Sequence, residues 1–98
     1  MELKSIMTDD FKHCFLCGKE SQQIHHVIGG AYRKKSEKYG LLVPLCMLCH
    51  GKVHDEPSQE TNKELKKIGQ ADFMMHYSYA EWMKQFGKNY MWGEKHGF

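Results

Sequence analysis

The sequence lacks a long apolar run, and this absence limits where the chain can reside. Its longest apolar stretch, Leu41 to Leu48, contains Pro44 and is far shorter than the roughly 20 residues that a membrane span needs. The first ten residues hold no apolar segment long enough for a signal peptide. We therefore expect a cytoplasmic protein that keeps its thiols reduced and makes no contact with a membrane.

A strong excess of charge is also missing. The formal net charge is +2, from 14 Lys and Arg against 12 Asp and Glu. This mild basicity permits a nucleic-acid partner without requiring one. The positive charge is partly concentrated in residues 33–38, where Glu37 alone opposes Arg33, Lys34, Lys35 and Lys38. The chain has no repeats and no low-complexity segment, and its length of 98 residues predicts a single domain over residues 1–98.

Four cysteines compensate for the thin core of so short a chain. They form two pairs, Cys14-x-x-Cys17 and Cys46-x-x-Cys49. In a reducing compartment this pattern indicates zinc rather than disulfides, and four thiolates make a closed, structural site. Two alternatives remain: unrelated pairs of buried thiols, and a thioredoxin-like redox motif. The second is disfavoured because neither pair lies in a βαβ pattern.

The histidines form an array of their own around the second cysteine pair. His50 and His54 are four residues apart in a predicted helix, so they share one face and can chelate a single ion. Cys49 points about 100° away from His50, which leaves it free for the zinc. His25 and His26 lie on the preceding strand. Each histidine alone is more simply a surface or core residue, but the array together indicates a second metal.

Apolar patterning and turn residues predict an α+β fold. Strands are expected at 23–28, where Gly29-Gly30 ends the first, and at 41–45. Residues 31–40 are basic and polar and predict a loop, with a helical turn over 32–39 as the alternative. Helices are expected over 46–55, over about 61–76 from a capping box at Thr61, and over 78–86 before Gly87.

The residues from Cys14 to His54 resemble the HNH endonucleases, the ββα-metal or His-Me finger group. The resemblance rests on the cysteine pairs, on the Leu42-Val43-Pro44-Leu45 strand and on the H-H … H-x-x-x-H array. It is most similar to small phage-borne or recombination-associated (Ref-like) members. It implies a ββα-metal core at about residues 13–56 with a four-cysteine structural zinc, followed by a C-terminal helical extension at about 58–98.

The resemblance also implies site roles. His26 matches the general base that activates water, and His25, His50 and His54 match the ligands of a catalytic divalent metal (Mg²⁺, Mn²⁺, Ni²⁺ or Zn²⁺). The function implied is metal-dependent hydrolysis of DNA, with RNA not excluded and the oligomeric state open. A flat strand would send His25 and His26 to opposite faces, so the strand must twist or bulge, or the two roles are exchanged.

One residue departs from the family pattern. Leu41 stands where an asparagine usually orients the base, and leucine has no side-chain hydrogen bond to give. This favours the alternative function, a non-catalytic zinc module that binds nucleic acid or protein. A zinc finger with two cysteine and two histidine ligands is disfavoured, because His50 follows Cys49 directly.

Two further sets of residues are candidates for nucleic-acid contact. Arg33, Lys34 and Lys35 could contact DNA phosphates from the predicted loop, although they suit an ordinary solvated loop equally well. The aromatic stripe of Tyr79, Trp82 and Phe86 is expected to lie in the core rather than to stack on bases.

Overall fold

The computed structural model describes residues 4–91, which form a two-stranded sheet and four α-helices. Within this range no helix combines the length and the apolar character that crossing a membrane demands. The predicted α+β class is confirmed, while residues 92–98 of the predicted helical extension lie outside the described residues. In chain order the elements are β1 (Gln23–His26), the 3-10 turn η1 (Gly30–Tyr32), α1 (Arg33–Tyr39), β2 (Leu42–Leu45), α2 (Met47–Asp55), α3 (Glu60–His76) and α4 (Tyr79–Phe86).

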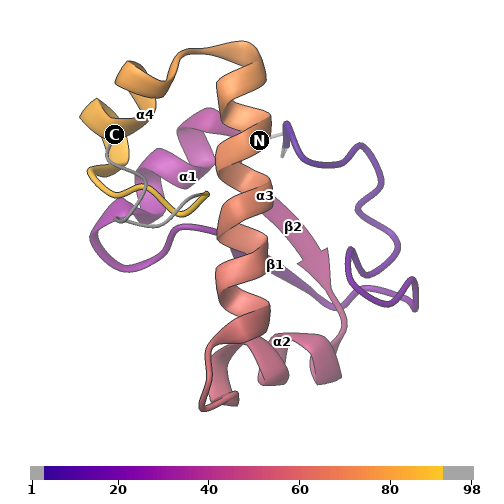
Figure 1. Ribbon diagram of the computed structural model, residues 1–98. Helices are drawn as coiled ribbons and strands as arrows, with labels where there is room; N and C mark the ends of the chain where they lie inside the picture. Colours follow the sequence, from indigo (N-terminus) through magenta and orange to yellow (C-terminus); the bar gives the residue numbers. More distant parts are fainter. Residues whose placement is uncertain (1–3, 92–98) are drawn as a thin grey trace.

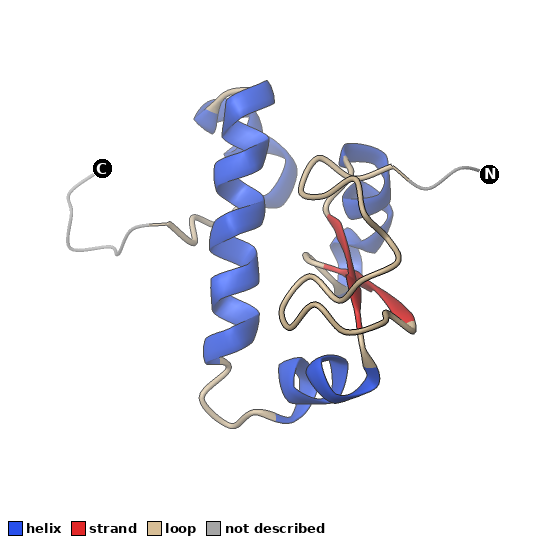
Figure 2. Ribbon diagram, turned by 90° about the vertical axis from the view of Figure 1, so that its right-hand side faces the viewer, coloured by secondary structure: helices blue, strands red, loops and turns tan. Residues whose placement is uncertain are grey.

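The sheet is a short antiparallel pair that positions the histidines. His25 lies opposite Val43 and His26 lies opposite Leu42, and every residue of β2 is buried. The backbone N–H of Val27 donates to Leu41 O at 3.0 Å, which carries the pairing one bond beyond the strands. Helix α3 crosses in front of the sheet in Figure 1 and stands to one side of it in Figure 2. One face of the sheet is therefore covered by α3.

The segment between the strands is helical, so the predicted loop over 31–40 is wrong and its helical-turn alternative holds. Helix α1 ends at Gly40, which adopts the left-handed φ of 75° and whose N–H donates to Ser36 O. The Ser36 hydroxyl is fully buried, donates to Ile28 O at 2.6 Å and accepts from Ile28 N–H at 3.2 Å. Burial of one face of α1 in the tertiary structure stabilises this helix. The charged sequence of the segment gives no sign of that burial.

The first cysteine pair lies in a tight turn that packs on β2. Gly18 has a φ of 80° and its N–H donates to Cys14 O at 2.9 Å, which closes the turn over residues 14–18 that we name the first knuckle. The Phe15 N–H donates to Pro44 O at 2.8 Å, which ties the turn to the strand. Cys46 caps α2, where its sulfur accepts from Cys49 N–H. The two cysteine pairs thus meet where β2 passes into α2.

The last two helices supply most of the aromatic core. Phe73, Trp82 and Phe86 are buried, with the Phe73 and Trp82 ring centroids 5.3 Å apart, so the core role predicted for Trp82 and Phe86 is confirmed; Tyr79 is only half-buried. Ser78 caps α4 and Gly87 ends it, as predicted. The predicted cap of α3 is wrong. That helix starts at Glu60, and the carboxylate of Glu56 accepts from Thr61 N–H at 2.7 Å.

Candidate metal centres

Four sulfur atoms form the first cluster. One Sγ from each of Cys14, Cys17, Cys46 and Cys49 lies within 4.8 Å of all the others. The Cys17 and Cys46 sulfurs are 3.6 Å apart. A tetrahedral site with Zn–S bonds of about 2.3 Å separates its sulfurs by about 3.8 Å, so this spacing suits one zinc ion. The predicted grouping of the four cysteines is confirmed, and it is compatible with a structural zinc.

The ionisation of these thiols is strongly unequal. Burial acts to raise the pKa of Cys14, but backbone N–H groups outweigh it and lower that pKa to about 6. Burial and the neighbouring sulfurs raise the pKa of Cys49 to about 12. Packed thiolates repel one another, so the four sulfurs can all ionise together only around a cation. A cation bound among the four sulfurs would offset this repulsion.

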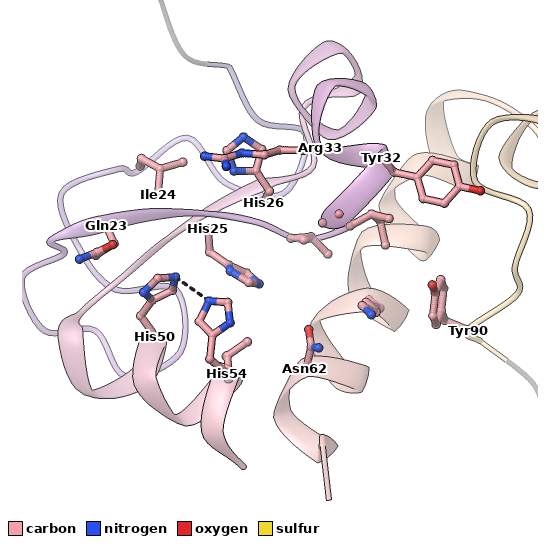
Figure 3. A pocket seen from close by; sticks show the side chains of 16 residues that line it. Gln23, Ile24, His25, His26, Tyr32, Arg33, His50, His54, Asn62 and Tyr90 are labelled. Atoms are coloured by element: carbon pink, nitrogen blue, oxygen red, sulfur yellow. Dashed lines mark hydrogen bonds between the residues drawn. The ribbon is translucent and has the colours of Figure 1, made fainter. Parts of the chain in front are cut away.

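Three histidines form the second cluster. One ring nitrogen from each of His25, His50 and His54 lies within 4.8 Å of the other two. His50 and His54 come from successive turns of α2, and their Nε2 atoms are 3.1 Å apart. With Zn–N bonds of about 2.0–2.1 Å, a tetrahedral site separates two nitrogens by about 3.3 Å. Figure 3 shows His25 on β1 pointing toward both of them.

His25 is the member that most needs a partner. Its side chain is buried, and its Nε2 is a buried nitrogen with no hydrogen-bond partner among the described residues. Such an unsatisfied atom costs about 1–3 kcal/mol. Burial first, and then His50, lower the pKa of His25 to about 4. Burial also lowers the pKa of His50. His25 is therefore neutral at pH 7 and has a lone pair ready for a ligand bond.

His26 points away from the three-histidine cluster. It projects from the opposite face of β1 (Figure 3), as strand alternation requires, and no bulge brings it round. Its Nε2 lies 2.9 Å from the Oε1 atom of Glu37 on α1. The His26 side chain is 15% exposed and that of Glu37 is 56% exposed. His26 nevertheless lines the same cavity as the cluster.

The three basic residues predicted to contact DNA fall in different surroundings. Arg33 lines the cavity that holds the histidines. The Lys35 ammonium donates to Gln85 O at 2.8 Å and lies over the Tyr32 ring, so it has a structural role. Lys34 is exposed on α1 and does not line the cavity. Only Arg33 therefore shares a surface with the histidines.

Leu41, at the position of the expected asparagine, is fully buried. Its side chain packs beside Gly69 of α3, where a Cβ on the glycine would meet Leu41 Cδ2 at 3.5 Å. The same Cβ would meet Val27 Cγ1 at only 3.2 Å, so the absence of a side chain at Gly69 lets α3 lie close to the hairpin. Leucine therefore serves the core at this position.

Nothing in the sequence indicated that three residues of the cavity wall belong to the site. The cavity has a volume of about 560 Å³, and its far wall includes Asn62, Lys66 and Tyr90. Asn62 and Lys66 are four residues apart on α3, a spacing that matches any exposed helix face. Only the packing of α3 against the hairpin makes them neighbours of the histidines. We name this cavity, with its histidines, the histidine cleft.

Comparisons with protein-family models, with curated proteins and with solved structures gave no match for this chain. The residues themselves therefore carry any functional argument. The site consists of a four-sulfur cluster at one end of α2 and a three-histidine cluster on the face of that helix that looks into the histidine cleft.

We predict that the four-cysteine cluster holds one zinc ion and that the fold depends on it. Cys46→Ser should lower the free energy of unfolding by roughly 4 kcal/mol or more, because metal binding contributes folding free energy in small domains. Elemental analysis and thermal melts are the measurements. Leu48→Ser is the control, since Leu48 lies between the two ligands yet is 76% exposed. A protein that stays folded after exhaustive chelation would contradict the prediction.

We predict a second, weaker metal ion at the three-histidine cluster. Soaking with excess Zn²⁺ or Ni²⁺ should give two ions per chain in the wild type and one in His50→Ala, because removing one of three ligands opens the chelate. Stoichiometry is measured by elemental analysis after gel filtration. His76→Ala, on the exposed end of α3, should keep two ions. One ion per chain in wild type and His50→Ala alike would exclude the second site, and two ions in both would exclude His50 as its ligand.

Proposed function

We propose that the chain is a metal-dependent endonuclease of the HNH type that hydrolyses phosphodiester bonds in DNA. The observation that carries the proposal is one cleft lined both by the three-histidine cluster, with an unsatisfied buried nitrogen on His25, and by His26 from the opposite face of β1. This donor set leaves coordination positions open, as a catalytic metal site does and a closed four-cysteine site does not. The two metal centres thus have separate roles, one structural and one catalytic.

In this proposal His26 is the general base. When the Glu37 carboxylate accepts from Nε2–H, the lone pair of His26 lies on Nδ1. Nδ1 takes a proton from water while the water oxygen bonds to phosphorus, and the bond from phosphorus to the leaving oxygen breaks. His25, His50 and His54 would hold a divalent cation, which would supply positive charge to stabilise the phosphate and the leaving oxygen.

Glu37 fills the role that Leu41 cannot. It lies on the α1 turn above the end of β1, and its carboxylate sets both the tautomer and the orientation of the His26 ring. A carboxylate bonded to the second nitrogen of a histidine is a common way to position an imidazole for proton transfer. Glu37 is thus a positioning residue, since it acts through His26 rather than on the substrate.

The alternative is a non-catalytic zinc module that binds nucleic acid or protein. The observation that favours it is the burial of Leu41, which leaves the base without the side chain usual at this position in the HNH family. The two functions differ in one measurable result, because only the endonuclease nicks a supercoiled plasmid when Mg²⁺, Mn²⁺ or Ni²⁺ is added.

We predict that the wild type nicks supercoiled plasmid and that His26→Ala reduces the rate by about 10²–10⁴-fold, the usual contribution of a general base. His26→Ala should keep two metal ions per chain, whereas His50→Ala should lose both activity and the second ion. Plasmid nicking and elemental analysis are run on the same preparations. If His26→Ala nicks the plasmid at the wild-type rate, His26 is not the general base. If the wild type nicks no plasmid with any of the metals, the proposed endonuclease is wrong and the non-catalytic zinc module is the remaining function.

We predict that Glu37→Ala lowers kcat by about 10–100-fold and leaves KM unchanged. The His26 ring would lose its fixed orientation for proton transfer, whereas the residues that bind the substrate would stay in position. Glu37→Gln keeps an acceptor oxygen at the same position and should recover part of the loss. Glu20→Ala removes the same charge from an exposed site in the first knuckle and is the control. A fall in substrate affinity alone would contradict the positioning role.

A further inference from the structure

Helix α3 and the segment after α4 form the far wall of the histidine cleft and continue beyond it. A second hollow of about 530 Å³ begins on the other side of this wall. Asn62, Lys66 and Tyr90 line both cavities. The second hollow adds three lysines, namely Lys63, Lys67 and Lys88. The two cavities thus adjoin at these three residues, which form their shared rim, and we name the pair of cavities the α3 track.

The α3 track is cationic along its length. The residues that line its two cavities include Arg33 and four lysines and no aspartate or glutamate. Within residues 4–91 none of these basic side chains forms an ion pair with a carboxylate. Lys63 and Lys67 also border a hollow with Glu60 and Glu64, so Arg33, Lys66 and Lys88 carry most of the net charge of the track. Positive charge lining a concave surface focuses the field and attracts anions. The track is therefore built to receive an anion.

The wall at the shared rim is held in place by partly buried hydrogen bonds. Gln70 of α3 is fully buried, and its amide donates to Asn89 Oδ1 at 2.9 Å and accepts from Tyr90 N–H at 2.7 Å. The Trp82 indole donates to Lys88 O at 2.7 Å. These bonds fix the backbone that carries Lys88 and Tyr90 before any ligand arrives. A preformed surface loses less entropy on binding.

Two ammonium groups converge on one ring at this rim. The Nζ atoms of Lys66 and Lys88 lie 5.3 Å and 5.4 Å from the centroid of the Tyr90 ring. Lys66 is half-buried, and its pKa is lowered by burial and then by the charge of Lys88. Holding two like charges together costs free energy, which an anion bound between or beside them would offset.

We propose that the α3 track carries the sugar-phosphate backbone of a nucleic-acid strand, with Lys66 and Lys88 contacting the phosphates next to the one at the histidines. The inference deepens the proposed function, since it rests on a phosphodiester reacting at the three-histidine cluster. It moves the main nucleic-acid surface from Lys34 and Lys35 on α1 to α3. Arg33, across the cleft, contacts the same strand from the other side.

A phosphodiester strand fits the track better than an acidic peptide does. A nucleic-acid backbone carries one negative charge on every nucleotide, so one strand can place successive charges in both cavities. The track offers lysines, which act as flexible point charges on phosphate, and a tyrosine whose ring already lies against their ammonium groups. The histidine cleft then receives one phosphate of the same strand.

The test measures binding separately from cutting. Fluorescein-labelled single-stranded DNA and its duplex are titrated with Lys66→Gln/Lys88→Gln protein without added divalent metal, at several KCl concentrations, with anisotropy as the readout. The slope of log Kd against log[KCl] should become shallower by about 1.4 on single strands or 1.8 on duplex, two contacts at about 0.7 or 0.9 each. Zinc content and thermal melts establish that the variant is folded.

The matched control is Lys19→Gln/Lys84→Gln, which removes the same charge from exposed residues outside both cavities and should keep the wild-type slope. Equal slopes in the two double variants would overturn the proposal. So would wild-type binding to polyglutamate as tight as to DNA. Salt-dependent binding through the track without any cleavage would contradict only the proposed endonuclease. Cleavage by the wild type, together with a wild-type slope in Lys66→Gln/Lys88→Gln, would contradict only the track.

Discussion

The positions of His25 and His26 depend on the antiparallel pairing of β1 with β2. The pairing spans only four residues of each strand, but β2 is buried throughout, so its register cannot slip without moving apolar side chains into water. The same alternation turns His25 toward α2 and His26 toward α1. A slip of one residue would exchange the two and leave the three-histidine cluster incomplete.

Helix α2 links the two candidate metal centres. Its N-terminus carries Cys46 and Cys49, which join the first knuckle, while the next two turns carry His50 and His54. Because the cysteine cluster anchors the start of this helix, it also sets where the histidine pair lies relative to His25. A structural metal at the sulfurs would therefore act on the cleft through geometry. With a bound ion the chain would gain rigidity here beyond what its small core supplies.

Helix α3 has two different faces, and each serves a separate purpose. Leu65, Gly69 and Phe73 are buried against the hairpin and the aromatic core. Asn62 and Lys66 look into the histidine cleft on the side of the helix that the hairpin leaves open. Close packing at Gly69 brings these polar residues near enough to His25 to share one cavity with it. The same contact thus builds the core and completes the cleft.

The sequence by itself determined which cysteines pair and that His50 and His54 lie together, because C-x-x-C pairs and histidines at i, i+4 owe their grouping to local geometry that spacing reveals. It also determined the α+β class and the end of α4 at Gly87, since these follow from periodicity and from a local left-handed turn. Only the tertiary structure decided that residues 33–39 form a helix, because burial of Ser36 on one face stabilises the helix despite the repulsion between its basic side chains. Only the structure brought Glu37 to His26 and Lys66 to His25, since these pairs are 11 and 41 residues apart in sequence and meet through packing that no local pattern encodes.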